Sequence, residues 1–127
     1  MSLVIPTRDR VDLLRQCVDS VLRRSTYPHF EILVVDNHSV EPETQAYLES
    51  LASEPRAKVL RYPHPFNYSA INNFAVRHAT GELLCLLNND IEVITPGWLE
   101  EMVVQALRPG VGAVGAMLYY PDDSIQH

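Results

Sequence analysis

The sequence predicts an α/β fold in which helices cover both faces of a mostly parallel sheet, giving three α/β/α layers. Short apolar runs of strand length alternate with segments whose apolar residues recur every three or four positions, in about five strands and four helices. Crossovers of this kind are right-handed and join parallel strands. The composition, with 46% apolar and 20% charged residues, is that of one globular domain over residues 1–127.

The amino-terminal residues predict a β-α-β unit. Residues 3–5 and 32–35 are continuous apolar runs, which are typical of strands buried on both faces. Between them, an apolar stripe at helical spacing predicts a helix that begins near Asp9, and we expect Asp9 to cap it. The stripe consists of Val11, Leu14, Val18, Val21 and Leu22.

Three further elements are expected in the middle of the chain. Residues 42–52 predict a helix with proline in its first turn, and residues 57–61 alternate between apolar and charged side chains as a third strand does. The two prolines of residues 62–65 exclude regular structure, so a loop follows. Residues 67–79 predict a short helix that ends before Gly81, a typical helix stop.

The remaining residues predict two strands with a helix between them. Residues 83–87 form the strongest strand pattern in the sequence. Thr95 is expected to cap a helix over residues 96–106, in which Trp98 belongs to the buried face. Residues 113–118 are expected to form the last strand.

Charge and composition exclude several classes of function. The net charge is −6 and the sequence has no basic run, so we expect no nucleic-acid partner. No segment approaches the roughly 20 apolar residues of a membrane span. Cys17 and Cys85 lie within apolar patterns and indicate buried, reduced thiols. We therefore expect a cytoplasmic protein, with peripheral contact to the inner membrane left open for a longer form.

Polar side chains follow three of the predicted strands. They lie in residues 6–9, 36–39 and 88–90. Because ligands of open parallel sheets bind outside the carboxyl ends of the strands, we expect these three clusters to face one crevice.

The sequence lacks the glycine-rich loops of the common nucleotide-binding folds. It has only five glycines and no G-x-G-x-x-G or P-loop pattern, which disfavours dinucleotide cofactors and P-loop chemistry. A diphosphate in this crevice would need another positive charge, and a divalent cation held by oxygen ligands provides one. The best candidate for the cation ligand is Asp90, which follows the strongest strand.

Four motifs resemble those of family 2 glycosyltransferases, in the same order and over essentially the whole chain. They are residues 4–9, residues 31–37, residues 66–73 and residues 86–90. The sequence is especially similar to bacterial rhamnosyltransferases and other polysaccharide- or lipopolysaccharide-building members, in which Asn-Asn-Asp stands in place of Asp-x-Asp.

The resemblance implies a GT-A fold with a Rossmann-like sheet, and a metal-dependent, inverting transfer of a sugar. The donor would be a UDP- or dTDP-sugar and the acceptor a hydroxyl of a saccharide or lipid-linked saccharide. It places Thr7 and Arg8 near the nucleoside, and Asp36 at the base edge. The implied nucleotide-sugar-binding residues are Pro6, Thr7, Arg8, Asp36, Asn37, Asn73, Asn88 and Asn89, and the implied ligands of Mn²⁺ or Mg²⁺ are Asp90 and Asn88.

Two departures from the family pattern affect the expected activity. Asn88 replaces the first Asp of Asp-x-Asp, and an amide is a weaker metal ligand than a carboxylate. The family's catalytic base lies in the acceptor-binding part, which we expect beyond His127, so this chain alone should be inactive.

Two other functions and several structural interpretations stay open at this point. A sugar nucleotidyltransferase normally has a glycine-rich basic loop after the first strand, but residues 6–10 contain no glycine. A non-catalytic, receiver-like module normally has a lysine late in the chain, but the only lysine is Lys58. Asp36 could simply end a strand, and Asn72 and Asn73 could form a solvated helix face.

Overall fold

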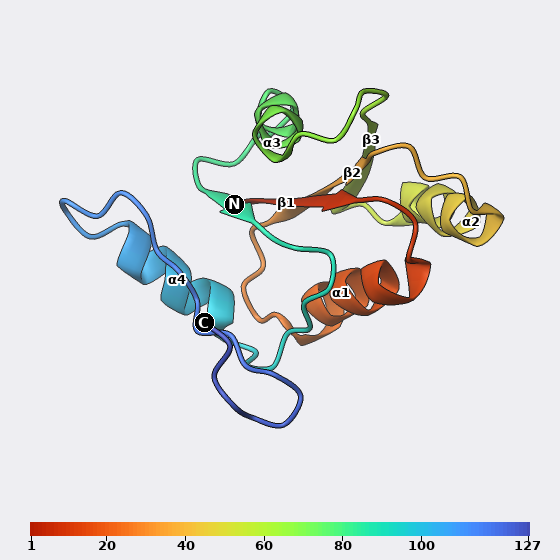
Figure 1. Ribbon diagram of the computed structural model, residues 1–127. Coiled ribbons are helices and arrows are strands. Elements are labelled where there is room, and N and C mark those ends of the chain that lie inside the picture. Colours follow the sequence, from red (N-terminus) through yellow and green to blue (C-terminus); the bar gives the residue numbers. More distant parts are fainter.

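The computed structural model describes residues 1–127 and contains four strands and four α-helices (Figure 1). In chain order they are β1 (Ser2–Thr7), α1 (Val11–Arg24), β2 (Glu31–Asp36), α2 (Pro42–Ser50), a 3₁₀ turn (Leu51–Ser53), β3 (Ala57–Arg61), α3 (Tyr68–Val76), β4 (Leu84–Leu86) and α4 (Trp98–Ala106). No helix or strand follows Ala106.

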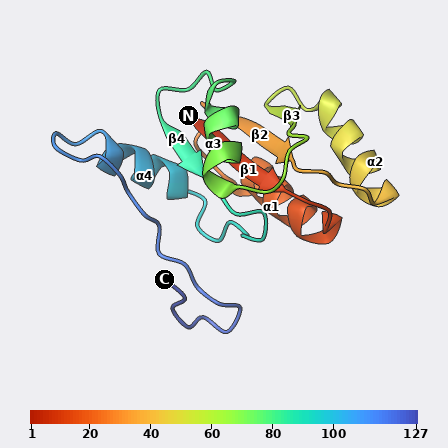
Figure 2. The same cartoon turned by 45° about the horizontal axis from the view of Figure 1, so that its top comes forward.

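The four strands form one parallel sheet in the order β3-β2-β1-β4 (Figure 2). In this register Thr7 lies opposite Asp36, and Asp36 lies opposite Arg61. Leu86 at the end of β4 lies opposite Val4 of β1, so the residues after β4 run alongside the end of β1. The carboxyl ends of β1, β2 and β4 therefore meet at one edge, as the sequence predicted.

Helices cover both faces of the sheet, which confirms the predicted three layers. On one face, Leu3 and Ile5 of β1 are fully buried against apolar residues of α1, α2 and α4. On the other, Val4 packs with Ile71 and Ala75 of α3. Figure 1 shows α3 alone above the sheet and α1 below it. Each fully buried aliphatic side chain contributes about 1.5–3 kcal/mol, so the alternation along β1 fixes the sheet between the two layers.

Gly81 before β4 is required by a close approach. A Cβ atom at this position would lie 2.7 Å from the backbone carbonyl carbon of Met1 and from the backbone nitrogen of Ser2. The amide of Gly81 also donates a hydrogen bond to Ser2 Oγ. The turn that ends the α3 layer therefore packs directly on the start of β1.

Two predicted helix starts were wrong. Asp9 does not cap α1, because Asp9 and Arg10 both have left-handed φ angles of 49° and 51° and the helix begins at Val11. Asp9 instead accepts hydrogen bonds from the amides of Val40 and Glu41, before α2. The cap that Thr95 was expected to provide is also absent, since α4 begins at Trp98 and Gly97 is its N-cap.

The predicted strand over residues 113–118 was also wrong, and the sheet has four strands rather than about five. This segment joins no ladder, and only an isolated antiparallel bridge between Tyr119 and Ile125 lies near it. A segment with strand propensity forms a strand only where the edge of a neighbouring strand provides hydrogen-bond partners. Residues 113–118 lie apart from the sheet and have no such neighbour (Figure 2).

Other sequence predictions agree with the structure. Cys17 and Cys85 are free and buried, as expected. Helix α3 is capped by the side chain of Asn67, which accepts a hydrogen bond from the amide of Ala70. Trp98 packs against the core and donates to Ser25 Oγ. None of the helices has the length and apolar character needed to cross a bilayer.

Candidate functional site

A cavity of about 390 Å³ opens at the carboxyl ends of β1 and β4. It receives residues from all three polar clusters that the sequence predicted to share a crevice. Predicted site residues in its lining are Pro6, Thr7, Arg8, Asn37, Asn88, Asn89 and Asp90, and the other lining residues are Arg10, Leu13, Phe66, Tyr68 and Ile71.

The first and third clusters are joined by a direct contact. Thr7 is buried at the end of β1, and Asn89 donates a hydrogen bond to its hydroxyl oxygen at 3.1 Å. The exposed Arg8 and Arg10 provide two guanidinium groups in the cavity lining. Arg10 forms an ion pair with Asp12 at 3.3 Å, so Arg8 carries the unpaired positive charge of the cavity.

Asp36 lies behind the cavity and does not line it. Its carboxylate is buried, accepts a hydrogen bond from the amide of Ser39 at 3.1 Å and forms an ion pair with Arg61. Arg61 also donates to Gln45 Oε1 at 3.2 Å. These contacts use the carboxylate to close the turn after β2 and to tie that turn to β3 and α2.

Asn37 is the member of the second cluster that faces the cavity. It is 2% exposed, and its amide nitrogen donates to the carbonyl oxygens of Tyr62 at 3.2 Å and His64 at 2.8 Å. Its buried side-chain oxygen has no hydrogen-bond partner. An unpaired buried acceptor costs about 1–3 kcal/mol. This oxygen belongs to a residue of the cavity wall but is not itself open to solvent.

The side chains that could hold a metal ion are Asp90 and Asn88, both exposed in the cavity lining. No group of three or more His, Cys, Asp or Glu side chains gathers to form a metal site. A hard divalent cation that takes one or two protein oxygens, and fills its shell with phosphate oxygens and water, is compatible with this sparse donor set.

Asn73 is exposed on α3 and does not line the cavity, so the structure does not bring it to the other predicted site residues. Its neighbour Asn72 is buried and donates to the carbonyl oxygen of Tyr68 at 2.9 Å. The aromatic residues Phe66 and Tyr68 had no predicted role in the site. Both side chains line the cavity and are 66% and 48% exposed, respectively. Their positions on either side of Asn67, the N-cap of α3, are the sequence signal that could have identified them as site residues.

A second cavity of about 290 Å³ adjoins the first and shares Asn88 and Asp90 with it. More of its lining residues are hydrophobic, and most come from residues 91–95, Trp98 and residues 116–119 near the carboxyl terminus. Asp90 therefore lies where the cavity at the strand ends meets the cavity beside α4.

The two buried thiols are unsuited to nucleophilic chemistry. Burial and the negative charge of Asp90 raise the pKa of Cys17 to about 12, and burial raises the pKa of Cys85 to about 11. Since the thiolate is the reactive form of cysteine, both residues are structural.

Residues 2–126 match the model of the family described as "Glycosyl transferase family 2". The chain is 54% identical over 127 residues to the O-antigen biosynthesis protein RfbC of Myxococcus xanthus, covering 100% of this chain and 10% of that protein. The chain thus spans only a small part of the length of this relative.

Two solved structures share the fold. The mannosyltransferase PcManGT from Pyrobaculum calidifontis, in complex with GDP-Man and Mn²⁺, is 24% identical with a TM-score of 0.82, over 96% of this chain and 36% of that one. S. aureus TarS 1–349 in complex with UDP-GlcNAc is 21% identical with a TM-score of 0.68, over 91% of this chain and 37% of that one. At these identities the likeness establishes the fold.

Proposed function

Because this chain belongs to glycosyl transferase family 2 and has the GT-A fold, we propose that it is the nucleotide-sugar-binding part of a glycosyltransferase. The reaction would transfer a sugar from a nucleoside diphosphate to a hydroxyl acceptor, with inversion at the anomeric carbon. One observation carries the proposal: polar residues that follow β1, β2 and β4 line a single cavity, with the carboxylate of Asp90 in its wall.

The nucleoside would lie between the ends of β1 and β2. A small shift of the cavity wall would open the unpaired side-chain oxygen of Asn37 to an N–H group of the base, whereas the family resemblance placed Asp36 at the base edge. Arg8 would pair with phosphate oxygens, and Thr7 with its partner Asn89 would fix the floor of the cavity. Phe66 and Tyr68 would cover the apolar faces of the bound nucleoside.

Asp90, with Asn88 as a second oxygen donor, would hold Mn²⁺ or Mg²⁺ at the diphosphate. The sparse donor set supports this role because such a cation takes most of its remaining ligands from phosphate and water. When bound there, the cation would stabilise the negative charge that develops on the leaving diphosphate.

The sugar would project from the first cavity past Asp90 toward the second cavity. The shared residues Asn88 and Asp90 support this path, since a diphosphate held at Asp90 leaves its sugar at the boundary of the two cavities. The base that deprotonates the acceptor hydroxyl would come from a part of a longer protein, and this chain by itself would bind the donor without completing the transfer.

The acceptor would be a saccharide or lipid-linked saccharide in cell-surface polysaccharide synthesis. The name of the Myxococcus xanthus relative, an O-antigen biosynthesis protein, supports this class. The two buried free thiols support a reducing, cytoplasmic site of reaction.

Calorimetric titration with UDP, dTDP and GDP, each with and without Mn²⁺, tests the proposal. We expect one of these nucleotides to bind measurably tighter with Mn²⁺, and Asp90→Ala to remove the Mn²⁺-dependent part of the affinity. Asp122→Ala is the matched control, because Asp122 is an exposed acid that lines neither cavity. Equal binding by the wild-type chain and Asp90→Ala in the presence of Mn²⁺ would refute the proposal.

A further inference from the structure

The segment that carries Asn88 and Asp90 is a loop without regular structure, between the end of β4 and the start of α4. Backbone groups of such a loop need hydrogen-bond partners from elsewhere, or they remain unpaired. Figure 1 shows the loop descending from the sheet and passing along α1 before it reaches α4. Side chains of α1 provide several of those partners.

Three residues of α1 bond directly to the backbone of this loop. The thiol of Cys17 lies 3.6 Å from the carbonyl oxygen of Asn88. The hydroxyl oxygen of Ser20 accepts from the amide of Val93 at 3.0 Å, and the guanidinium of Arg24 donates to the carbonyl oxygen of Val93 at 2.7 Å. The loop is thus bound to α1 just before Asp90 and again three residues after it.

A side chain of the loop is held by the same helix. Glu92 accepts a hydrogen bond from Gln16 at 2.7 Å and forms an ion pair with Arg24 at 2.9 Å. Residues spaced by three or four positions share one side of a helix, so Gln16, Cys17, Ser20 and Arg24 form one stripe along α1. We refer to these four residues as the loop-binding stripe.

The side chain of Asp90 makes no hydrogen bond or ion pair of its own within the protein, unlike the bonded side chain of Asn89. Its position is therefore determined through the backbone on either side of it. Ser20 is buried and its hydroxyl also donates to the carbonyl oxygen of Cys17, so the atom that receives the Val93 amide is itself fixed.

We propose that the loop-binding stripe of α1 positions the carboxylate of Asp90 for the cation and diphosphate, an inference that rests on the proposed function. Ser20 and Arg24 are positioning residues that touch neither the nucleotide nor the cation. Ligand groups must be held within about 0.5 Å of the productive geometry, so loss of the contacts at Val93 weakens binding at a site that these residues do not line.

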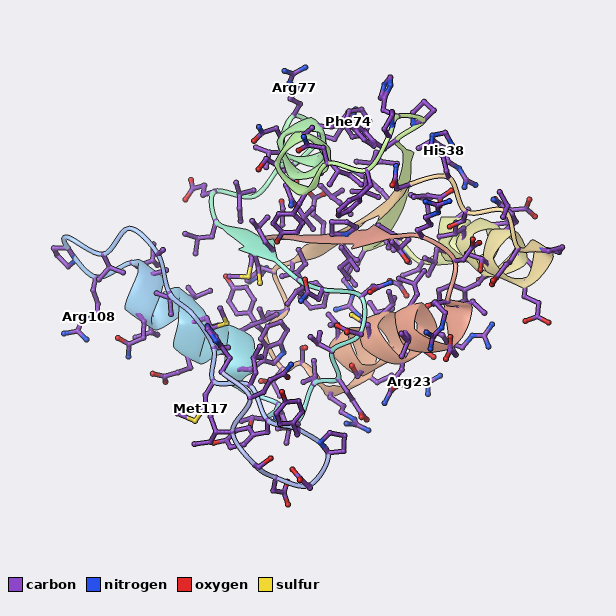
Figure 3. All side chains as sticks on the ribbon, in the orientation of Figure 1. Arg23, His38, Phe74, Arg77, Arg108 and Met117 are labelled. Atoms are coloured by element: carbon purple, nitrogen blue, oxygen red, sulfur yellow. The ribbon has the colours of Figure 1, made fainter.

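Two members of the stripe can be separated from the core function of α1. Leu14, Cys17, Val18 and Val21 are fully buried, whereas Gln16 and Arg24 are exposed. Arg24→Ala therefore tests the loop contacts with the core intact. Arg23→Ala is the matched control, because Arg23 is the adjacent arginine, has only a 3.9 Å ion pair with Asp19 and projects away from the sheet (Figure 3).

The first measurement is the affinity of the chain for UDP in the presence of Mn²⁺. We expect Arg24→Ala and Ser20→Ala to weaken it about tenfold, Arg24→Lys to restore part of it, and Arg23→Ala to leave it unchanged. Arg23→Ala removes the same positive charge from the neighbouring position, so it controls for the direct effect of charge on the anionic nucleotide. Wild-type affinity in both Arg24→Ala and Ser20→Ala would overturn the inference.

The second measurement needs no ligand. Backbone amide resonances of Asn88, Asn89 and Asp90 should shift, and the Val93 amide should exchange faster with solvent, in Ser20→Ala and Arg24→Ala but not in Arg23→Ala. Unchanged resonances and exchange would overturn the positioning role. Absence of Mn²⁺-dependent nucleotide binding by the wild-type chain would instead overturn the proposed function, while the amide measurement still decides whether α1 positions the loop.

Discussion

Asp36 and Asn37 are neighbours in the sequence with different environments in the fold. The strand register turns Asp36 toward Arg61 of β3, where its charge is paired and buried. Asn37, one residue further, lines the cavity and keeps a free acceptor. The sequence identified the cluster, but side-chain direction at the end of β2 depends on β3 and on the loop after it, which the local pattern does not specify.

The double function of Asn37 leads to a prediction for its removal. Asn37→Ala leaves the carbonyl oxygens of Tyr62 and His64 without their donor, and it removes the proposed acceptor for the base. We expect the free energy of unfolding to fall by about 1–3 kcal/mol in urea titrations, and nucleotide affinity to fall with it.

Asn73→Ala is the matched control for this prediction. Asn73 is an exposed asparagine outside the cavity lining, so its removal should change neither stability nor affinity. If the two variants behave alike, Asn37 has neither of the assigned functions.

At the scale of elements, the strands and helices that bury an apolar face were predictable and the segments between them were not. Strands β1 and β2 and helix α1 follow from continuous runs and one stripe, because burial of those residues determines the element. The start of α1 was not predictable from the local pattern. Asp9 accepts hydrogen bonds from backbone amides just before α2, about 30 residues away, and is therefore not available to cap α1.

Glu31 ties four segments together at the amino end of the sheet. Its carboxylate on β2 accepts hydrogen bonds from Ser2 Oγ of β1 at 2.8 Å and from the amide of Thr80 at 2.7 Å, and it pairs with Lys58 of β3 at 3.5 Å. Burial opposes the charge, but the hydrogen bonds from Thr80 and Ser2 outweigh burial and hold the pKa of Glu31 below its ordinary value.

A lowered carboxyl pKa predicts a defined dependence of stability on pH. Ionised Glu31 stabilises the fold above the unfolded-state pKa of about 4.5, and that stabilisation is lost as pH falls through the lowered pKa of the folded state. We expect Glu31→Gln to reduce the free energy of unfolding by about 1 kcal/mol at pH 7, and the difference from wild type to shrink as pH falls through the lowered pKa of the folded state.

Urea titrations at several pH values measure this effect. Glu49→Gln, which changes an exposed glutamate of α2, is the control and should follow the wild-type curve throughout. A deficit in Glu31→Gln that persists unchanged at low pH would mean that the carboxylate charge is not what stabilises the fold.

At the scale of the whole molecule, the protein consists of a buried three-layer body and an extended carboxyl-terminal arm, residues 107–127. Most of the arm is exposed, including Met117 (Figure 3), although residues 116–119 also line the second cavity. Its sequence has strand character but receives no partner strand, which is why the pattern over residues 113–118 predicted an element that the fold does not form.

This division predicts a sharp contrast in amide hydrogen exchange. No backbone amide from residue 112 to residue 117 donates a hydrogen bond, so these amides should exchange at rates near those of an unstructured peptide. Amides of residues 3–5 and 32–35 lie in the buried sheet and should be protected by orders of magnitude. Strong protection of residues 112–117 would mean that the arm pairs as a strand after all.

We propose that a nucleoside diphosphate and a divalent cation bind together at the carboxyl ends of β1 and β4. Paramagnetic broadening of backbone amide resonances by substoichiometric Mn²⁺ in the presence of UDP locates the ion directly. We expect resonances of Thr7, Arg8 and residues 88–90 to disappear first, while those of α2 persist. Broadening centred on the acidic residues Glu100 and Glu101 of α4, or on Asp122 and Asp123, would contradict this proposal.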